Sequence, residues 1–335
     1  MTYQALGRSG LITARLTLGT MLFGEDSQRT TSVAEAADLI DRYLAAGGNH
    51  IDCADVYAQG RSEEITGQLL RGKREQLILS SKVRFPTSDD PNDQGLSRRH
   101  ILRSTEQMLR RLQTDHLDLL YLHCWDPVTP PEETLRALED LIRSGKIRYW
   151  GFSNFTAWQA MKMVGLCDRF HYQRCIAAQY QYSLVQRDLE DEFLALFEEE
   201  GIGLLPWGPL GGGFLTGKYR RETKTGGRIE HTPDHAEEAW HRRNTEQNWQ
   251  TLEVVRELAE THETTPVAIA LAWLLHRPTV ASVVIGPRVV AQLSDNLAAT
   301  EVQLSETELQ RLEEVSRPAS RYPYRMIAAY AGREF

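Results

Sequence analysis

The stretch Leu77-Ile78-Leu79-Ser80-Ser81-Lys82-Val83 is a short, largely apolar run rich in residues that favour strands, and the amphipathic stretch Ser97–Leu112 follows it. This succession predicts a strand and a crossover helix that leads to the next parallel strand. Comparable runs recur along the chain, most of them roughly 25–40 residues apart, a spacing that fits one βα unit each. They are Arg15–Leu18, His50–Cys53, Leu117–Cys124, Ile147–Phe152, Ile176–Tyr180, Ile202–Trp207 and Val280–Ile285.

Eight such runs predict an α/β fold, a closed (β/α)₈ TIM barrel that forms one domain over residues 1–335. Among the intervening helices, Ser32–Ala46 shows apolar residues three to four apart and stops at Gly47-Gly48. Before the first strand, Tyr3–Leu11 reads as a small hairpin with glycine in its turn. We expect this hairpin to plug the bottom of the barrel.

Composition and charge narrow the class of protein. The chain of 335 residues is 41% apolar and 25% charged, which excludes a disordered or collagen-like protein. Its net charge of −8 argues against a nucleic-acid-binding face. The start of the chain shows no leader pattern and no apolar run is long enough to span a membrane, so we expect a cytoplasmic protein without a membrane partner. Four cysteines without a CxxC pair predict neither a disulfide framework nor a metal site.

Long segments after three of the predicted strands break the regular rhythm. They are Arg84–Gly95, Trp125–Pro131 and Lys218–Gln247, and long loops after barrel strands are where active sites form. The tail, residues 317–335, is aromatic and basic. It could pack on the barrel or line the pocket, and we favour packing.

Four polar residues at strand ends carry the chemistry that we predict. Asp52, Lys82 and His123 end the second, third and fourth strands, and Tyr57 lies in the loop after Asp52. Each alone has an ordinary structural explanation: a helix-cap acceptor, a surface charge, a core histidine and a rim aromatic. At the open end of one barrel they would instead face the substrate together.

Together these four residues suit the reduction of a carbonyl group. A buried lysine needs a carboxylate partner to stay charged, and its charge favours ionisation of a nearby tyrosine. We therefore expect Lys82 to help Tyr57 release its proton to a developing alkoxide, with His123 donating to or orienting the same oxygen. Such a site reduces an aldehyde or ketone when a hydride source lies on the other face.

The chain resembles the aldo-keto reductase family over essentially its whole length. The motifs that carry the resemblance are Ile51-Asp52-Cys53-Ala54-Asp55-Val56-Tyr57, Ser80-Ser81-Lys82, Leu120-Tyr121-Leu122-His123, Gly151-Phe152-Ser153-Asn154-Phe155, Pro206-Trp207-Gly208-Pro209-Leu210-Gly211-Gly212-Gly213 and Ile285-Gly286-Pro287-Arg288. The resemblance implies a (β/α)₈ barrel, bound NADPH or NADH, and a catalytic tetrad of Asp52, Tyr57, Lys82 and His123. Cys53 departs from the pattern, because the family usually carries threonine or serine there, and we assign it to packing.

The resemblance also places the cofactor. Ser153, Asn154 and Gln179 would hold the nicotinamide carboxamide, and Trp207 would stack on the ring. The remaining candidates lie at strand ends, in the glycine-rich segment and at a late helix start, and we expect them to hold the rest of the dinucleotide. They are Gly19, Thr20, Met21, Asp52, Gly208, Pro209, Leu210, Gly211, Gly212, Lys218, Arg228, Gly286, Arg288, Gln292, Asp295 and Asn296.

Three cations favour NADPH over NADH. Arg288 beside the helix start, with Lys218 and Arg228, would pair with the additional 2′-phosphate. Arg228 depends on segment 218–247 folding over the cofactor. The chain lacks a G-x-G-x-x-G motif, so the dinucleotide would not be bound in the Rossmann manner.

The substrate is a small carbonyl compound, and its identity stays open. Tyr57, His123 and Trp125 would contact it, and further pocket walls would be Met21, Phe23, Arg84 and Tyr322–Tyr330. Such a mixture accepts an apolar carbonyl compound or a keto-sugar. Two alternatives remain: a nucleotide-binding regulatory subunit, like the potassium-channel β subunits that share these motifs, and a Schiff-base lyase that uses Lys82. The oligomeric state is also open.

Overall fold

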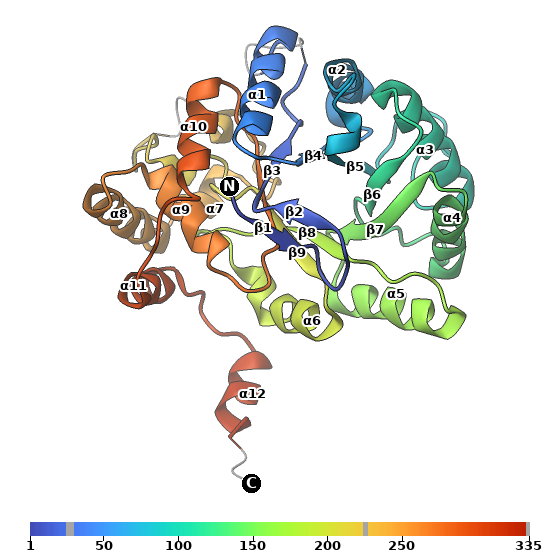
Figure 1. Cartoon of the computed structure of the whole chain (residues 1–335). Helices are drawn as coiled ribbons and strands as arrows, with labels where there is room; N and C mark the ends of the chain where they lie inside the picture. Colours follow the sequence, from blue (N-terminus) through green and yellow to red (C-terminus); the bar gives the residue numbers. More distant parts are fainter. Residues whose placement is uncertain (25–29, 224–226, 333–335) are drawn as a thin grey trace.

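Eight parallel strands form a nearly closed barrel in the computed structural model, which describes residues 1–24, 30–223 and 227–332 (Figure 1). From β3 to β9 each strand pairs with the next one in the chain, and β10 pairs with β3. The Leu204–Val280 bridge joins β9 to the segment just before β10. The predicted TIM barrel is confirmed. Its strands are β3 (Leu16–Gly19), β4 (His50–Asp52), β5 (Ile78–Val83), β6 (Leu117–Leu122), β7 (Ile147–Ser153), β8 (Ala177–Gln181), β9 (Gly203–Trp207) and β10 (Val283–Ile285).

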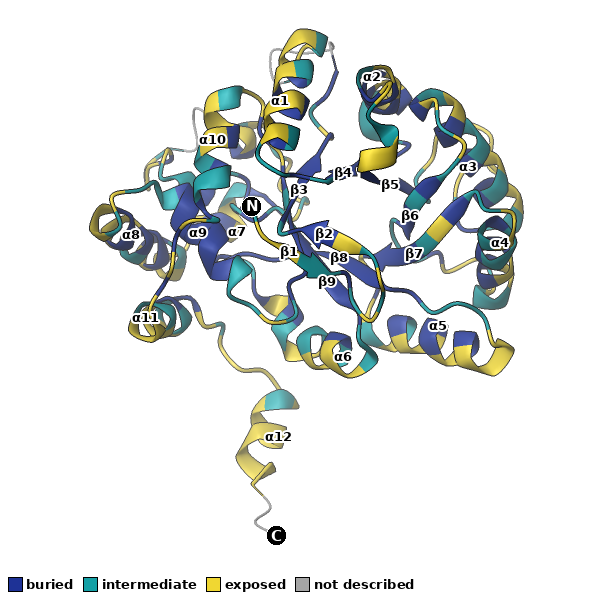
Figure 2. Cartoon of the chain, viewed as in Figure 1, coloured by how far each residue is buried: buried dark blue, intermediate teal, exposed yellow. Residues whose placement is uncertain are grey.

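Helices surround the barrel, with their buried faces toward the strands and their exposed faces outward (Figure 2). Within the described part of the chain, none of them is long and apolar enough to cross a membrane. The helices are α1 (Val33–Ala45), α2 (Arg61–Leu69), α3 (Arg98–Leu112), α4 (Pro131–Arg143), α5 (Ala157–Phe170), α6 (Phe193–Glu200), α7 (Trp240–Arg243), α8 (Glu246–Thr261), α9 (Pro266–Leu275), α10 (Val290–Ala298), α11 (Glu306–Ser316) and α12 (Tyr324–Tyr330).

The two helices predicted in detail begin at their capping residues. The Ser32 hydroxyl accepts a hydrogen bond from the Glu35 backbone N–H, and the Glu35 carboxylate accepts one from the Ser32 backbone N–H. This capping box satisfies two N–H groups that the first turn leaves without partners. At α3, the Ser97 hydroxyl accepts from the His100 N–H. Gly47 follows α1 with a φ of +87°, so the predicted glycine stop is confirmed.

An antiparallel hairpin covers the N-terminal end of the barrel, as Figure 1 shows at the centre of the view. Its strands are β1 (Tyr3–Ala5) and β2 (Ile12–Ala14), and Gly7, with a φ of +58°, lies in the turn. Leu6 is fully buried and packs into the barrel interior against Leu119, Tyr121, Ile176, Ala177, Leu205 and Ala281. The predicted plug is confirmed, so access to the barrel interior is from its C-terminal end.

The C-terminal tail corrects an expectation. Neither packing on the barrel nor lining the pocket holds for Tyr322–Tyr330, because α12 projects away from the barrel and buries none of its residues (Figures 1 and 2). Within the described part of the tail, Arg321 pairs with Asp188 at 2.7 Å, Tyr324 donates to Glu192 at 2.9 Å, and the Arg317 carbonyl oxygen accepts from the Gln247 side chain at 2.7 Å. Aromatic composition alone predicted packing, but no residue of α12 is buried.

Candidate active site

Lys82 is the centre of a buried polar cluster at the C-terminal end of the barrel. It ends β5 and is completely buried, as is Asp52 apart from 2% of its surface. Lys82 Nζ donates to Asp52 Oδ2 at 2.5 Å, to the Cys53 carbonyl oxygen at 2.7 Å and to the Tyr57 hydroxyl at 3.2 Å. Three of the four predicted catalytic residues are therefore in direct contact.

The ammonium of Lys82 is held in its charged form. Burial by itself would lower the pKa of Lys82, but the Asp52 carboxylate and the Tyr57 phenol together raise it above its usual value. A buried charge needs such partners to remain ionised. The interpretation of Lys82 as a surface charge is therefore wrong.

A chain of hydrogen bonds through three buried side chains orients the Asp52 carboxylate. The Ser80 hydroxyl donates to Asp52 Oδ1 at 2.7 Å, and His50 Nε2 lies 3.0 Å from that hydroxyl. His50 Nδ1 in turn lies 3.1 Å from the Thr13 hydroxyl, and burial lowers the pKa of His50 to about 4. Sequence reasoning missed His50, although the two-residue period of a strand places it on the same face as Asp52.

Tyr57 is placed by a tight turn rather than by a strand. It opens the 3₁₀ segment Tyr57–Gly60, in which Ala58 and Gln59 have φ values of +46° and +53°. The Lys82 ammonium lies 4.9 Å from the centre of the Tyr57 ring. This geometry keeps the phenol beside the ammonium.

The pKa of Tyr57 differs in direction from our expectation. Burial raises it above its usual value, and the nearby Lys82 lowers it by less than burial raises it. The expected influence of Lys82 is present, but desolvation of the phenolate outweighs it. Tyr57 is therefore protonated at neutral pH, which is the form that a proton donor needs.

His123 faces the same space from β6. Its ring lies edge-on to the Tyr57 ring with 6.2 Å between the ring centres, and its Nδ1 is buried without a hydrogen-bond partner within the described residues. Burial, with the charges of Lys82 and Arg84, lowers the pKa of His123 well below its usual value. The ring is therefore neutral and can donate one N–H to an oxygen atom.

The residues predicted to hold the nicotinamide carboxamide lie together at the ends of β7 and β8. Ser153 pairs with Gln179 in register, and its hydroxyl donates to the Gln179 carbonyl oxygen at 2.6 Å. Asn154, with a φ of +57°, donates to the His123 carbonyl oxygen at 2.9 Å. The side-chain nitrogens of Gln179 and Gln181 are buried without partners among the described residues. Such unsatisfied amide donors fit a carboxamide ligand.

Gln181 is a further candidate that sequence reasoning missed. It ends β8 two residues after Gln179, so the two side chains leave the same face of the strand. The same period would have identified it.

The glycine-rich segment after β9 is a series of tight turns. Gly208, Gly211, Gly212 and Gly213 all have positive φ values, between +57° and +86°. A Cβ on Gly211 would lie 2.4 Å from a Val185 methyl group, so this approach requires glycine. The Gly211 and Gly213 N–H groups donate to the Gly208 and Leu210 carbonyl oxygens, so these two are not available to a bound anion. Trp207 ends β9 at the start of this segment, with Pro209 and Leu210 inside it.

Two of the three predicted phosphate-binding cations influence each other. Burial lowers the pKa of Lys218, and the positive charge of Arg288 lowers it further. Arg228 instead pairs with Glu238 at 3.0 Å, and Glu238 is 5% exposed. The charge of Arg228 is thus balanced within the chain.

The other predicted residues of this group lie before α10 and along it, with Asp295 and Asn296 in its C-terminal half. The Gln292 side chain accepts from the Arg288 backbone N–H at 2.9 Å and so orients the turn before the helix. Asn296 is buried within α10, Asp295 is half-buried beside it, and Gly286 is exposed just after β10.

The end of β3 lies against the catalytic cluster. The Thr20 N–H donates to the Asp52 carbonyl oxygen at 2.9 Å, next to Gly19 at the strand end. Met21 is 39% exposed and available to a ligand. Phe23 is fully buried in the core, so its assignment as a pocket wall is wrong. Trp125, half-buried, packs edge-on against Phe155 at 5.1 Å.

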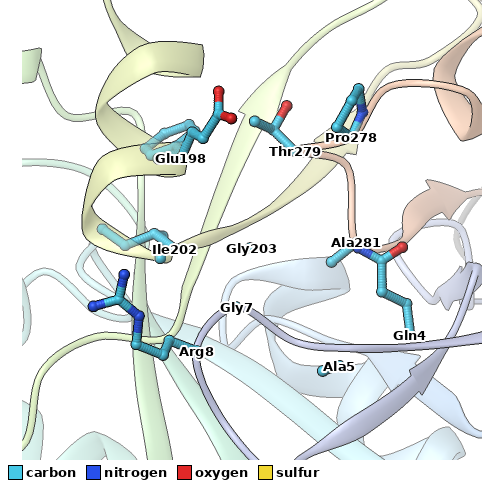
Figure 3. Close-up of a pocket in the computed structure, with 12 residues that line it drawn as sticks. Gln4, Ala5, Gly7, Arg8, Glu198, Ile202, Gly203, Pro278, Thr279 and Ala281 are labelled. Carbon is cyan, nitrogen blue, oxygen red and sulfur yellow. The ribbon is translucent and has the colours of Figure 1, made fainter.

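A cavity of about 400 Å³ lies at the opposite end of the barrel (Figure 3). It is bounded by the hairpin turn, the end of α6 and the segment before β10, and its labelled residues include Arg8, Glu198 and Thr279. Gly203, the first residue of β9, lines it, so it opens at the N-terminal end of the strands. Residues at this end of a TIM barrel serve stability rather than catalysis. The catalytic cluster is elsewhere.

Comparison with known proteins agrees with this geometry. The model of the aldo/keto reductase family matches residues 15–317. An oxidoreductase of Bacillus subtilis is 36% identical over 94% of this chain and 96% of its own length. A probable voltage-gated potassium channel subunit beta of Arabidopsis thaliana is 35% identical over 97% of this chain and its full length. Versiconal hemiacetal acetate reductase of Aspergillus parasiticus is 30% identical over 96% of this chain and 99% of its own.

Proposed function

The chain belongs to the aldo/keto reductase family, and from this premise we propose that it reduces a small aldehyde or ketone with NADPH, using Tyr57 as general acid. Membership makes it an NAD(P)H-dependent oxidoreductase that reduces carbonyl compounds. The observation that carries the finer proposal is the contact between Lys82, Asp52 and Tyr57.

Tyr57 protonates the carbonyl oxygen as negative charge develops there. Because burial raises its pKa, the phenol stays protonated until an alkoxide, a stronger base than a phenolate, forms beside it. The proton leaves the phenol while Lys82 Nζ lies 3.2 Å away, so the ammonium stabilises the new phenolate. Asp52 holds that ammonium in place and in its charged form.

His123 orients the carbonyl group. Its neutral ring faces Tyr57 edge-on, so one N–H of the ring donates to the substrate oxygen that the phenol protonates. Trp125 provides an apolar wall next to it. These two residues and Tyr57 form the substrate-binding part of the site.

The cofactor-binding residues are arranged around the same opening. When bound, the nicotinamide cofactor supplies the hydride. Ser153, Asn154 and Gln179 would hold its carboxamide, and Trp207 would stack on its ring. Segment 208–212 would hold the pyrophosphate, and residues 218–223 and 227–247 would lie over it.

Two cations support a preference for NADPH. Lys218 and Arg288 would pair with the additional 2′-phosphate through charge-assisted hydrogen bonds, and that anion would offset the repulsion that lowers the pKa of Lys218. NADH has no such group.

Two other functions are weaker fits. A regulatory role is suggested by the name of the Arabidopsis relative, but a regulatory subunit does not need a phenol held beside a buried ammonium. A Schiff-base lyase needs an unprotonated lysine, whereas the raised pKa of Lys82 keeps it protonated and engaged with Asp52. Borohydride in the presence of substrate should therefore leave no substrate carbon on Lys82.

Tyr57→Phe tests the proposal directly. We expect NADPH-dependent turnover of a panel of aldehydes, diketones and keto-sugars to fall about 10²–10⁴-fold, with NADPH affinity unchanged by fluorescence titration. Tyr3→Phe, exposed at the opposite end of the barrel, is the matched control and should retain full activity. Near-normal turnover in Tyr57→Phe would refute the role of Tyr57.

A further inference from the structure

Arg84 holds a strained position at the mouth of the catalytic cluster. It lies two residues after Lys82, just beyond the end of β5, and its φ is +155°. Gly95 N–H donates to its carbonyl oxygen at 2.8 Å and holds the backbone there. Residues with side chains rarely adopt such a φ, and where they do, the strain is most often retained for a function of the side chain.

The guanidinium of Arg84 is not satisfied by the chain. Its Nε is buried without a hydrogen-bond partner, and no ion pair within the described residues involves it. Its contact is with the face of Phe85, where the guanidinium carbon lies 5.4 Å from the ring centre. A cation that stacks on an aromatic ring keeps its donors free for an anion.

The neighbouring carboxylates are already engaged. Asp126 accepts hydrogen bonds from the Leu96 and Val128 N–H groups and from the Thr129 hydroxyl. The charge of Arg84 also lowers the pKa of Asp126, but it is weaker than several other influences on that carboxyl group. Asp93 pairs with Arg103 at 2.6 Å. The described part of the chain therefore offers Arg84 no carboxylate of its own.

Arg84 also stands beside the group that orients the carbonyl. The His123 backbone N–H donates to the Val83 carbonyl oxygen at 2.9 Å, so β5 and β6 bring Arg84 and His123 to the same edge of the barrel. The Phe85 ring lies 4.7 Å from the His123 ring, and the charge of Arg84 acts on His123. The Arg84 guanidinium and the His123 ring therefore both contact the Phe85 ring at this edge of the barrel.

The dinucleotide phosphates do not account for Arg84. In the order β10-β3-β4-β5-β6-β7-β8-β9, strands β5 and β6 are as far as possible from β9 and β10. Lys218 and Arg288 follow β9 and β10, so they lie across the barrel opening from Arg84. Arg84 therefore lies apart from the cations assigned to the cofactor phosphate.

We propose that Arg84 binds an anionic group of the carbonyl substrate, which makes the preferred substrates oxo acids, carboxylated aldehydes or phosphorylated aldehydes. The inference rests on the proposed reductase function. A guanidinium matches a carboxylate or a phosphate with two parallel hydrogen bonds, and a carbonyl at another position of the same substrate would meet Tyr57.

Matched substrate pairs test the proposal. The pairs are succinic semialdehyde with butanal, 4-carboxybenzaldehyde with 4-methylbenzaldehyde, and glyceraldehyde 3-phosphate with glyceraldehyde. We expect the wild-type enzyme to prefer the anionic member of at least one pair. Arg84→Gln should lower kcat/KM for that member about 10–100-fold, mainly through KM, and leave its neutral partner within about twofold. Arg84→Lys should restore part of the preference.

The controls distinguish the role of Arg84 from the proposed reductase function on which it rests. Arg99→Gln, an exposed arginine on α3, should change neither substrate. Unchanged turnover of the neutral aldehyde shows that Arg84→Gln is folded. A preference in the carboxylate or the phosphate pairs supports the proposal and identifies the anion. If the wild type reduces both members of every pair equally, or Arg84→Gln lowers both alike, the role of Arg84 is refuted and the reductase function stands. If nothing is reduced with NADPH, the proposed function itself fails.

Discussion

Lys82 Nζ lies 2.5 Å from Asp52 Oδ2, and both side chains are buried at the point where β4 and β5 meet the open end of the barrel. The pair does two things at once. It keeps an ammonium charged inside the protein, and it presents that ammonium to the Tyr57 hydroxyl. Stability and the proposed catalysis therefore depend on the same contact.

Asp52→Asn should destabilise the protein by about 3–5 kcal/mol, because it leaves a buried ammonium without its counter-charge. The double variant Asp52→Asn with Lys82→Met should recover much of that loss, since it removes the unpaired charge as well. Urea unfolding of the two single variants and the double variant measures the coupling. Additive losses would show that the pair is not coupled. Activity should be lost in all three variants.

Asp55→Asn should change how stability depends on pH. Burial raises the pKa of Asp55 from 3.8 to about 7. Because the folded state holds this proton more tightly, the stability that Asp55 contributes is fully present below pH 3.8 and is lost as the pH rises toward 7. Asparagine does not titrate, and its side-chain oxygen still accepts from Ser104, as Asp55 does at 2.9 Å.

The measurement for Asp55 is the free energy of unfolding of Asp55→Asn minus that of the wild type, between pH 4 and pH 8. We expect this difference to rise with pH by at most about 4 kcal/mol, at about 1.4 kcal/mol for each pKa unit. Asp89→Asn, an exposed aspartate, is the control and should give a flat difference. A flat curve for Asp55→Asn would contradict the prediction.

Arg288→Gln should convert a preference for NADPH into near-indifference. The loss of one charge-assisted contact to the 2′-phosphate should raise KM for NADPH about 10–100-fold and leave KM for NADH nearly unchanged. Initial rates with each cofactor at a saturating aldehyde concentration give the ratio. Arg136→Gln, exposed on α4, should leave both values as they are. Equal effects on both cofactors would argue that Arg288 does not touch the phosphate.

A chain that ends at Pro318 should be as stable as the whole protein. Residues of α12 bury nothing, and the Arg321–Asp188 and Tyr324–Glu192 contacts are exposed, so each is worth little. We expect the melting temperature to stay within about 2 °C. A chain that ends at Leu304, which also loses the fully buried Leu312 of α11, should melt far lower and serves as the comparison. A large drop on removal of the tail alone would mean that α12 packs in solution.

Much of the catalytic cluster was predictable because a parallel barrel turns sequence position into spatial position. Asp52, Lys82 and His123 end neighbouring strands, and strands in register bring their ends to one edge. The two-residue period of a strand would also have found His50, two residues before Asp52, and Gln181, two residues after Gln179. The importance of His50 could not be predicted because it depends on its partners, Ser80 in β5 and Thr13 in the hairpin.

Other features depend on packing that no local pattern encodes. The raised pKa of Tyr57 reflects how completely distant segments remove water from the phenol, and a sequence lists the nearby charges but not this desolvation. The burial of Phe23 in the core and the ion pair between Arg228 and Glu238 likewise depend on how the folded chain packs.

The sequence by itself determined the barrel, its plug, the helix caps and the family, because strand period, capping residues and glycine positions act over a few residues and repeat along the chain. Tertiary structure alone decided which charges are balanced, which direction the pKa of Tyr57 takes, that α12 leaves the barrel, and that Arg84 has no ion-pair partner among the described residues. These properties follow from desolvation and from contacts between distant segments, and both exist only when the chain is folded.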